Sequence, residues 1–128
     1  MTKNFSKKEF DCNDKSEMPI NVYHNMVKVA NQLQALRDEL GKPIHINSAY
    51  RSEEYNAKIG GVSNSQHIMG RAADIVIKGM TPLEVYTTID RLIENGDMLQ
   101  GGLGIYPKKG FVHYDIRGTK ARWNNQKK

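Results

Sequence analysis

The stretch NSQHIMGRAADIVI, residues 64–77, joins a polar loop to an apolar run and places His67 seven residues before Asp74. A carboxylate at the head of a buried strand is costly unless something pairs with it. Gly70 lies between the two residues and allows the backbone to turn sharply, so the histidine can return toward the aspartate. The pattern leaves two alternatives for Asp74: a metal ligand or an ordinary hydrogen-bonded aspartate.

Four segments of the chain are predicted as strands, because their apolar residues alternate or form short runs bounded by turn residues. The clearest is PIHINSAY, where Ile44 and Ile46 share one face and the polar residues between them share the other. The last two segments are joined by PKKG, a turn of hairpin length. The predicted strands are residues 43–50, 72–77, 102–106 and 110–116.

Three segments are predicted as helices. Residues 21–40 carry apolar side chains at three- and four-residue steps, and Gly41 is placed to end that helix. Residues 81–96 begin with a capping box that starts at Thr81, and residues 52–61 form a shorter helix. The order helix, strand, short helix, strand, helix, strand, strand predicts an α+β domain with a small, largely antiparallel sheet.

The length of 128 residues predicts one domain, residues 1–128, with an irregular lead-in of about a dozen residues and a core over about residues 19–123. No apolar run is long enough to span a bilayer, and the polar, basic N-terminus lacks the apolar region of a secretory signal. We therefore expect a protein made in the cytoplasm without a signal peptide and without a membrane partner. Cys12 is the only cysteine, so no intramolecular disulfide is expected.

The net charge of +5 comes from the two ends of the chain. Residues 11–107 hold nine basic and twelve acidic side chains, whereas residues 108–128 hold seven basic side chains and one acidic one. A basic end favours an anionic partner such as a nucleic acid or a bacterial cell wall, although a merely solvated terminus has the same composition. No nucleic-acid-binding motif accompanies these residues, so nucleic acid is not the expected partner.

His113 lies in FVHYDI, where Phe111, His113 and Asp115 share one face of the predicted strand. A face that carries a histidine and an aspartate two residues apart lies next to solvent or a ligand rather than in an apolar core. Joined with His67 and Asp74, His113 completes a set of two imidazoles and one carboxylate, which is a common ligand set for catalytic zinc. Two unrelated histidines and a hydrogen-bonded aspartate remain the alternative on spacing alone.

The motifs SAYRSEEYN, GGVSNSQHIMGRAADI and FVHYDIRGTKARW together resemble the zinc D-alanyl-D-alanine carboxypeptidase family, which cleaves peptidoglycan peptides and shares its fold with the hedgehog signalling domain. The resemblance covers about residues 19–123 and is closest to the short single-domain branch. It implies a hedgehog/DD-peptidase-like fold and one zinc ion bound by His67, Asp74 and His113. It also implies that Arg51 faces the substrate near the metal, whereas an ion pair with a neighbouring glutamate is the alternative for that residue.

The chain departs from the family at the general base. One branch carries a glutamate three residues before the last zinc histidine, and that position is Gly110 here. Asp115, two residues after the histidine, is then the predicted base, which would take a proton from the attacking water and pass it to the leaving amine. The alternative role for Asp115 is to hold a ligand histidine in the correct tautomer.

Four residues that flank the predicted site are candidates for binding substrate amides, although loop structure alone also explains them: Ser48, Tyr50, Ser65 and Gln66. Arg122 and Trp123 are candidates for lining the cleft, with packing of the C-terminal segment as the alternative role of Trp123.

The expected function is that of a monomeric zinc metallopeptidase, either a D,D-carboxypeptidase or an endopeptidase, acting on peptidoglycan stem peptides. The expected absence of a signal peptide fits two sources. One is a phage lysis enzyme that reaches the wall through a membrane pore, and the other is a bacterial enzyme exported by another route. The alternative function is a non-catalytic, zinc-stabilised wall-binding module.

Overall fold

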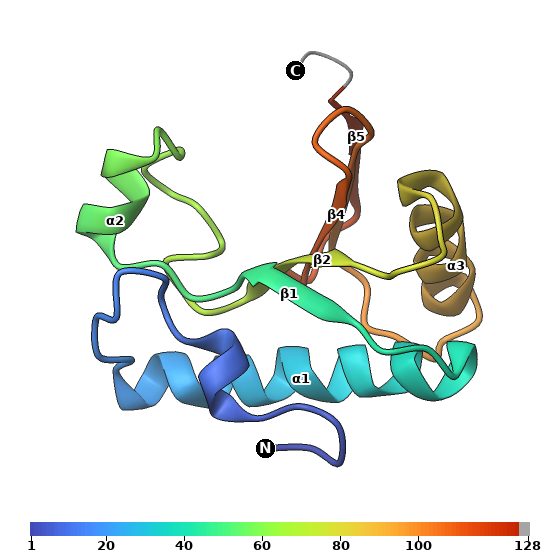
Figure 1. Ribbon diagram of the computed structural model, residues 1–128, viewed down its shortest axis with the longest axis horizontal. Helices are drawn as coiled ribbons and strands as arrows, with labels where there is room; N and C mark the ends of the chain where they lie inside the picture. Colours follow the sequence, from blue (N-terminus) through green and yellow to red (C-terminus); the bar gives the residue numbers. More distant parts are fainter. Residues whose placement is uncertain (126–128) are drawn as a thin grey trace.

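The computed structural model describes residues 1–125, which form a five-stranded sheet with helices packed mainly on one face (Figure 1). The strand order is β1-β2-β4-β3-β5, in which only the β3–β5 pair is parallel. The predicted α+β class with a largely antiparallel sheet is therefore confirmed. The strands are β1 (His45–Ser48), β2 (Ala72–Val76), β3 (Gly102–Tyr106), β4 (Phe111–Asp115) and β5 (Ala121–Asn124).

Predicted capping residues lie at the end of α1 (Ile20–Leu40) and at the starts of α2 (Glu53–Lys58) and α3 (Pro82–Glu94), whereas α2 ends at Lys58, before the glycines that were expected to end it. Gly41 ends α1 in the left-handed conformation, and Ser52 accepts a hydrogen bond from the backbone N–H of Tyr55 at the start of α2. Thr81 and Glu84 form the predicted capping box of α3. Local signals therefore account for these three capped ends.

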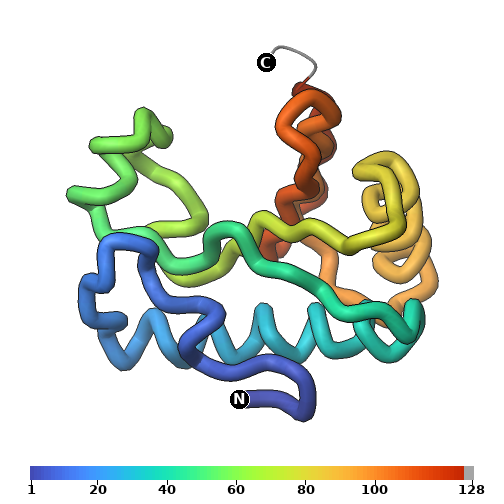
Figure 2. Tube along the Cα trace, viewed as in Figure 1, coloured from blue at the N-terminus to red at the C-terminus, as the bar shows by residue number. Residues whose placement is uncertain are grey.

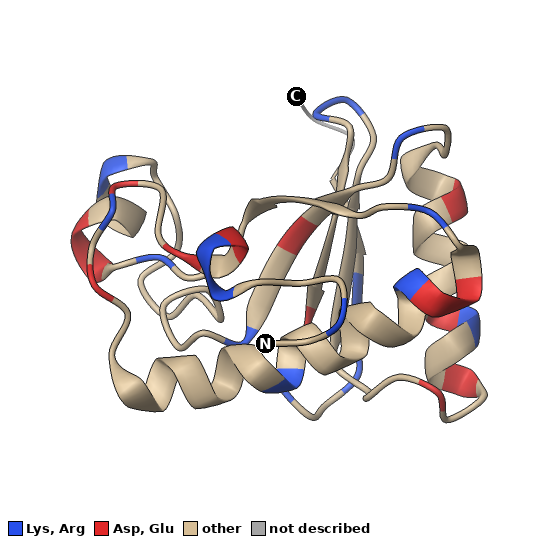
Figure 3. Ribbon diagram, turned by 60° about the horizontal axis from the view of Figure 1, so that its bottom comes forward, with Lys and Arg blue, Asp and Glu red and all other residues tan. Residues whose placement is uncertain are grey.

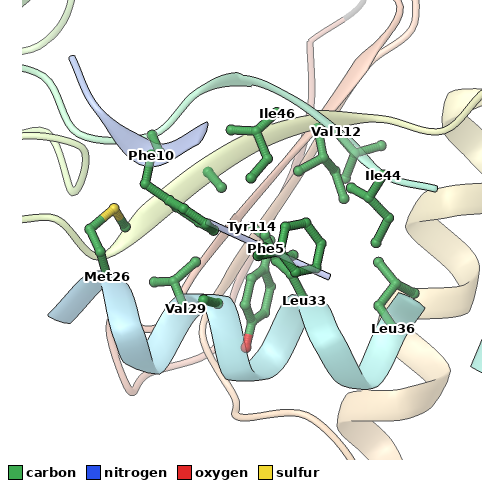
Figure 4. Close-up of a cluster of buried hydrophobic side chains, with 14 of the residues drawn as sticks. Phe5, Phe10, Met26, Val29, Leu33, Leu36, Ile44, Ile46, Val112 and Tyr114 are labelled. Carbon is green, nitrogen blue, oxygen red and sulfur yellow. The ribbon is translucent and has the colours of Figure 1, made fainter. Parts of the chain in front are cut away.

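The hydrophobic core lies between α1 and one face of the sheet. Figure 4 shows α1 side chains such as Val29 and Leu33 directed toward Val112 and Tyr114 of β4. Each of these four side chains is buried, so the apolar stripe predicted along residues 21–40 is the core-facing side of the helix.

The N-terminal lead-in belongs to the core. Phe5 and Phe10 are buried and meet edge to face, with ring centroids 6.0 Å apart, and Phe10 ends a 3₁₀-helix, η1 (Lys7–Phe10). Burial thus begins before residue 19, where the range of the family resemblance starts. Two isolated phenylalanines in a polar segment carry no periodicity, so nothing in their immediate sequence indicates burial.

Strand β5 was not among the predicted strands. Its sequence, ARWN, is short and lacks alternating apolar residues, and all four side chains remain at least partly exposed. It becomes a strand because it pairs in parallel with β3, with Gly104 opposite Trp123. This pairing forms one edge of the sheet and brings an indole ring toward the face that α1 does not cover.

That second face of the sheet is where the predicted site residues lie. The tube in Figure 2 shows α2 and its following loop on one side, and the β3–β4 hairpin with β5 on the other, both standing away from α1. Among residues 1–125, no helix combines the length and apolar character needed to cross a bilayer.

Candidate metal centre

His67, Asp74 and His113 meet on the sheet face away from α1. Asp74 in β2 lies opposite His113 in β4 in the strand register, while His67 comes from the loop that precedes β2. All three side chains are buried, and one ligand atom from each lies within 4.8 Å of the others. The structure thus brings the three predicted ligands together around a single position.

The outer nitrogen of each imidazole is held by the protein. His67 Nδ1 lies 2.7 Å from the carbonyl oxygen of Ala49, and His113 Nε2 lies 2.7 Å from Asp115 Oδ2. Both outer nitrogens therefore act as donors, and the inner nitrogens, His67 Nε2 and His113 Nδ1, lie 3.2 and 3.0 Å from Asp74 Oδ1. Two imidazole nitrogens and one carboxylate oxygen, oriented by outer partners, form a donor set that fits zinc.

The charges of the centre are strongly coupled. Burial raises the pKa of Asp74, but hydrogen bonds from His113 and His67 outweigh burial and hold that pKa well below its ordinary value. Burial disfavours the charged form of His113, but its hydrogen bonds to Asp115 and Asp74 prevail and raise its pKa.

Asp115 lies behind His113 rather than in the cleft. Its side chain is fully buried, and its carboxylate accepts hydrogen bonds from the backbone N–H of Gly102 at 2.9 Å and from the guanidinium of Arg117 at 2.8 and 2.9 Å. These contacts and His113 outweigh the effect of burial and lower the pKa of Asp115. Because both carboxylate oxygens are engaged, this position favours the orienting role of Asp115 over its predicted role as base.

Arg51 faces the cleft but is also tied to a predicted ligand. Its guanidinium donates to Asp74 Oδ2 at 3.2 Å, to Asn56 Oδ1 at 3.3 Å and to Ser48 Oγ at 3.1 Å. Among the described residues its ion-pair partner is Asp74, not a neighbouring glutamate. Arg51 therefore holds the outer oxygen of Asp74 while Oδ1 faces the two histidines.

A cleft of about 580 Å³ opens over the centre. Ser65 and Gln66, two of the four predicted substrate-binding residues, line the cleft, and Gln66 Oε1 is buried with no hydrogen-bond partner among residues 1–125. The other two lie outside its lining: Ser48 supports Arg51, and Tyr50 is buried in the core. The opposite wall includes Trp123, as predicted, but not Arg122, whose guanidinium pairs with Asp90 instead. The other residues of this wall were not predicted: Tyr106, Lys109, Phe111, Arg117 and Asn125.

Two glycines of β3 make room for this arrangement. A Cβ atom at Gly102 would collide with the Asp115 carboxylate, and one at Gly104 would collide with the indole of Trp123. Glycine inside a strand often marks a close approach of another group, so GGLG was an available signal in the sequence. The signal does not say which groups approach, since both partners come from other strands.

Comparison with known proteins finds a match to the peptidase M15 family model over residues 3–115. The chain is 32% identical over 100 residues to the peptidoglycan L,D-endopeptidase MepK of Escherichia coli (strain K12), which covers 73% of this chain and 51% of the relative. It is 49% identical over 45 residues to the zinc D-Ala-D-Ala carboxypeptidase of Streptomyces albus G, covering 34% of this chain and 18% of the relative. The chain thus spans about half or less of the length of these curated relatives.

Proposed function

Because the chain belongs to the peptidase M15 family, we propose that its buried centre binds one zinc ion and hydrolyses peptide bonds. The observation that carries the proposal is the convergence of His67, Asp74 and His113, whose ligand atoms lie within 4.8 Å of one another beneath an open cleft. Two oriented imidazole nitrogens and one carboxylate oxygen are also a donor set that suits zinc.

The substrate that we propose is a peptide of bacterial peptidoglycan, which places the site of action at the cell wall. The names of the relatives support this choice, since one is a peptidoglycan L,D-endopeptidase and another a zinc D-Ala-D-Ala carboxypeptidase. The cleft of about 580 Å³ over the centre leaves room for part of a peptide chain.

The protein groups around the centre have distinct roles in this proposal. When bound, the zinc ion supplies Lewis acidity, which polarises a carbonyl group and makes a water molecule more acidic. Asp115 and the carbonyl of Ala49 hold a proton on the outer nitrogens of His113 and His67, so that the inner nitrogens would be the ones to bind the ion. Arg51 holds Asp74 in place and presents its cationic edge to the cleft, where it can attract a substrate oxygen.

The metal site is tested by elemental analysis of purified variants. We expect His67→Ala to lose bound zinc, because an inner ligand is removed. His45→Ala is the matched control, since His45 is an exposed histidine on β1 and should leave the zinc content unchanged. Full zinc content in His67→Ala would refute the proposed ligand set.

The activity is tested by incubating the zinc-loaded protein with peptidoglycan and identifying released fragments by mass spectrometry. Cleavage that stops on chelation of zinc is the expected result, and the fragment masses identify which peptide bond is cut and whether the enzyme is a carboxypeptidase or an endopeptidase. Binding of wall material by the zinc-loaded protein without any cut bond would instead establish the non-catalytic wall-binding module.

A further inference from the structure

The cleft wall formed by Tyr106, Lys109 and Trp123, called here the hairpin wall, contributes none of the proposed metal ligands. Tyr106 ends β3, Lys109 lies in the turn before β4, and Trp123 lies in β5. All three line the same cleft as His67, Asp74 and His113. The hairpin wall is therefore placed to contact a substrate whose reacting bond lies at the centre.

The aromatic part of the hairpin wall is held in place by packing. The rings of Tyr106 and Phe111 are stacked, with centroids 4.5 Å apart and planes at 15°. The indole of Trp123 lies over Gly104, its centroid 5.2 Å from that of His113, and Arg117 lies over the indole at 5.5 Å. Side chains fixed in this way lose little conformational freedom when a ligand binds.

The polar groups of the hairpin wall are available as donors. The indole N–H of Trp123 donates to the Tyr106 hydroxyl oxygen at 3.0 Å, so the hydroxyl hydrogen points to another partner. Within residues 1–125 that hydrogen has no acceptor, and Lys109 forms no ion pair. Figure 3 shows basic residues at the tip of the β3–β4 hairpin with no acidic residue beside them.

The charge balance of the cleft indicates which ligand would satisfy these donors. The residues that line the cleft include three cations, Arg51, Lys109 and Arg117, and a single acid, Asp74. Two of the cations are neutralised, Arg51 by Asp74 and Arg117 by Asp115, whereas Lys109 pairs with no acid in the described part of the chain. A divalent ion at the centre would make the cleft still more positive and would favour an anionic ligand.

We propose that the hairpin wall is a substrate subsite that selects peptides with a carboxylate near the bond to be cut. Lys109 pairs with that carboxylate, and the Tyr106 hydroxyl, oriented by Trp123, donates to a carbonyl oxygen of the same peptide. The inference rests on the proposed function, since it specifies the class of peptide that the cleft accepts.

The test uses the intrinsic fluorescence of Trp123, the only tryptophan of the chain, as a reporter of peptide binding to zinc-free and zinc-loaded protein. The probes are stem peptides released from peptidoglycan, either untreated or with their carboxylates converted to carboxamides. We expect the untreated peptides to bind about three- to tenfold more tightly, which is the range for a solvent-accessible charge-assisted contact.

Lys109→Met should abolish the preference for untreated peptides. Lys108→Met is the matched control and should keep it, because Lys108 is also exposed but does not line the cleft. Tyr106→Phe keeps the stacked ring and should weaken binding of both peptide forms by up to about tenfold, the loss expected for one hydrogen bond. Trp123 emission remains available in all three variants.

The outcomes separate this inference from the proposed function. Suppose that peptidoglycan is cleaved in a zinc-dependent way. If the protein then binds both peptide forms equally, or if Lys109→Met keeps the preference for untreated peptides, the subsite is overturned and the peptidase activity stands. A Lys109-dependent preference without any cleavage supports the subsite and overturns the peptidase activity. Absence of binding by either form, with and without zinc, overturns the subsite.

Discussion

At the scale of single residues, the two aspartates of the site differ in which histidine nitrogens they contact. Asp74 places one carboxylate oxygen between the two inner nitrogens, whereas Asp115 contacts the outer nitrogen of His113 and is otherwise enclosed by Gly102 and Arg117. A fully buried carboxylate that accepts several hydrogen bonds is well suited to holding a histidine in one tautomer. It is poorly placed to exchange protons with a substrate in the cleft.

Asp115→Asn should therefore lower zinc affinity more than it lowers the turnover of the zinc-loaded protein. The amide cannot hold the protonated outer nitrogen of His113 as a carboxylate does, so we expect zinc affinity to fall about 10- to 100-fold, and saturating zinc to restore most of the turnover. Competition with a chelator measures the affinity. Asp97→Asn, at an exposed position, is the control. Unchanged zinc affinity together with lost turnover would return Asp115 to the role of general base.

The raised pKa of His113 predicts opposite pH dependences for the two forms of the protein. A folded-state pKa above the ordinary 6.5 contributes stability that is complete below 6.5 and is lost as the pH rises through the folded-state pKa. The lowered pKa values of Asp74 and Asp115 contribute stability above 3.8 that stays constant in this window. The protein without zinc should therefore become less stable as the pH rises above 6.5 and through the raised pKa of His113.

Zinc binding should show the reverse trend, because the ion competes with the proton on His113. We expect its affinity to rise with pH and to level off above the raised pKa. Thermal unfolding with and without zinc, from about pH 6 to about pH 9, checks both trends. His45→Gln should leave both slopes unchanged, since His45 is exposed on β1. A zinc affinity that is flat over this range would contradict the assignment of His113.

At the scale of secondary-structure elements, β3 and β5 organise the cleft wall. The alternation of β3 places Leu103 in the core and its glycines on the opposite face, where Asp115 and Trp123 lie directly over the backbone. Strand β5 depends on the space left by the missing side chain of Gly104, because Trp123 is opposite Gly104 in the parallel register. A larger side chain in β3 would occupy the space of either partner.

Alanine at the two glycines should separate metal binding from substrate binding. Gly102→Ala displaces the Asp115 carboxylate and should lower zinc affinity, because His113 loses its outer partner. Gly104→Ala displaces the Trp123 indole and should weaken peptide binding while zinc affinity is retained. Each variant serves as the control for the other in parallel zinc and peptide titrations. Equal effects of both variants on zinc affinity would contradict this division.

At the scale of the whole molecule, the sheet separates a packing face from a functional face. One face, with α1 and the N-terminal segment, supplies the hydrophobic core, and the other carries the centre and the cleft. Phe5 and Phe10 complete the core, so the first ten residues are part of the domain rather than an appendage. Stability of the site therefore depends on residues that contact none of its ligands.

Phe10→Ala tests this dependence. Removing a fully buried aromatic ring should lower the free energy of unfolding by about 3–5 kcal/mol, measured by urea denaturation. Ile20→Ala, at a side chain that is 72% exposed, should change it by no more than about 0.5 kcal/mol. A loss below about 1 kcal/mol in Phe10→Ala would show that the N-terminal segment contributes little to the core.

The sequence by itself determined the helices and most of the sheet. Capping at Thr81 and Gly41 and alternation around Ile46 act over a few residues, so they can be detected without knowledge of the rest of the chain. The three metal-binding candidates were predicted because their motifs resemble a known family and because their chemistry suits zinc.

Only the tertiary structure decided which way Asp115 faces, what Arg51 contacts, and that β5 and the N-terminal phenylalanines join the fold. Each of these depends on partners far along the chain: Arg51 meets Asp74 of β2, and Trp123 meets Gly104 of β3. Strand register and close packing set such contacts, and no signal within a few residues records them. The residue types therefore predicted a metal-binding site, whereas the role of each residue depended on which side chains surround it in the fold.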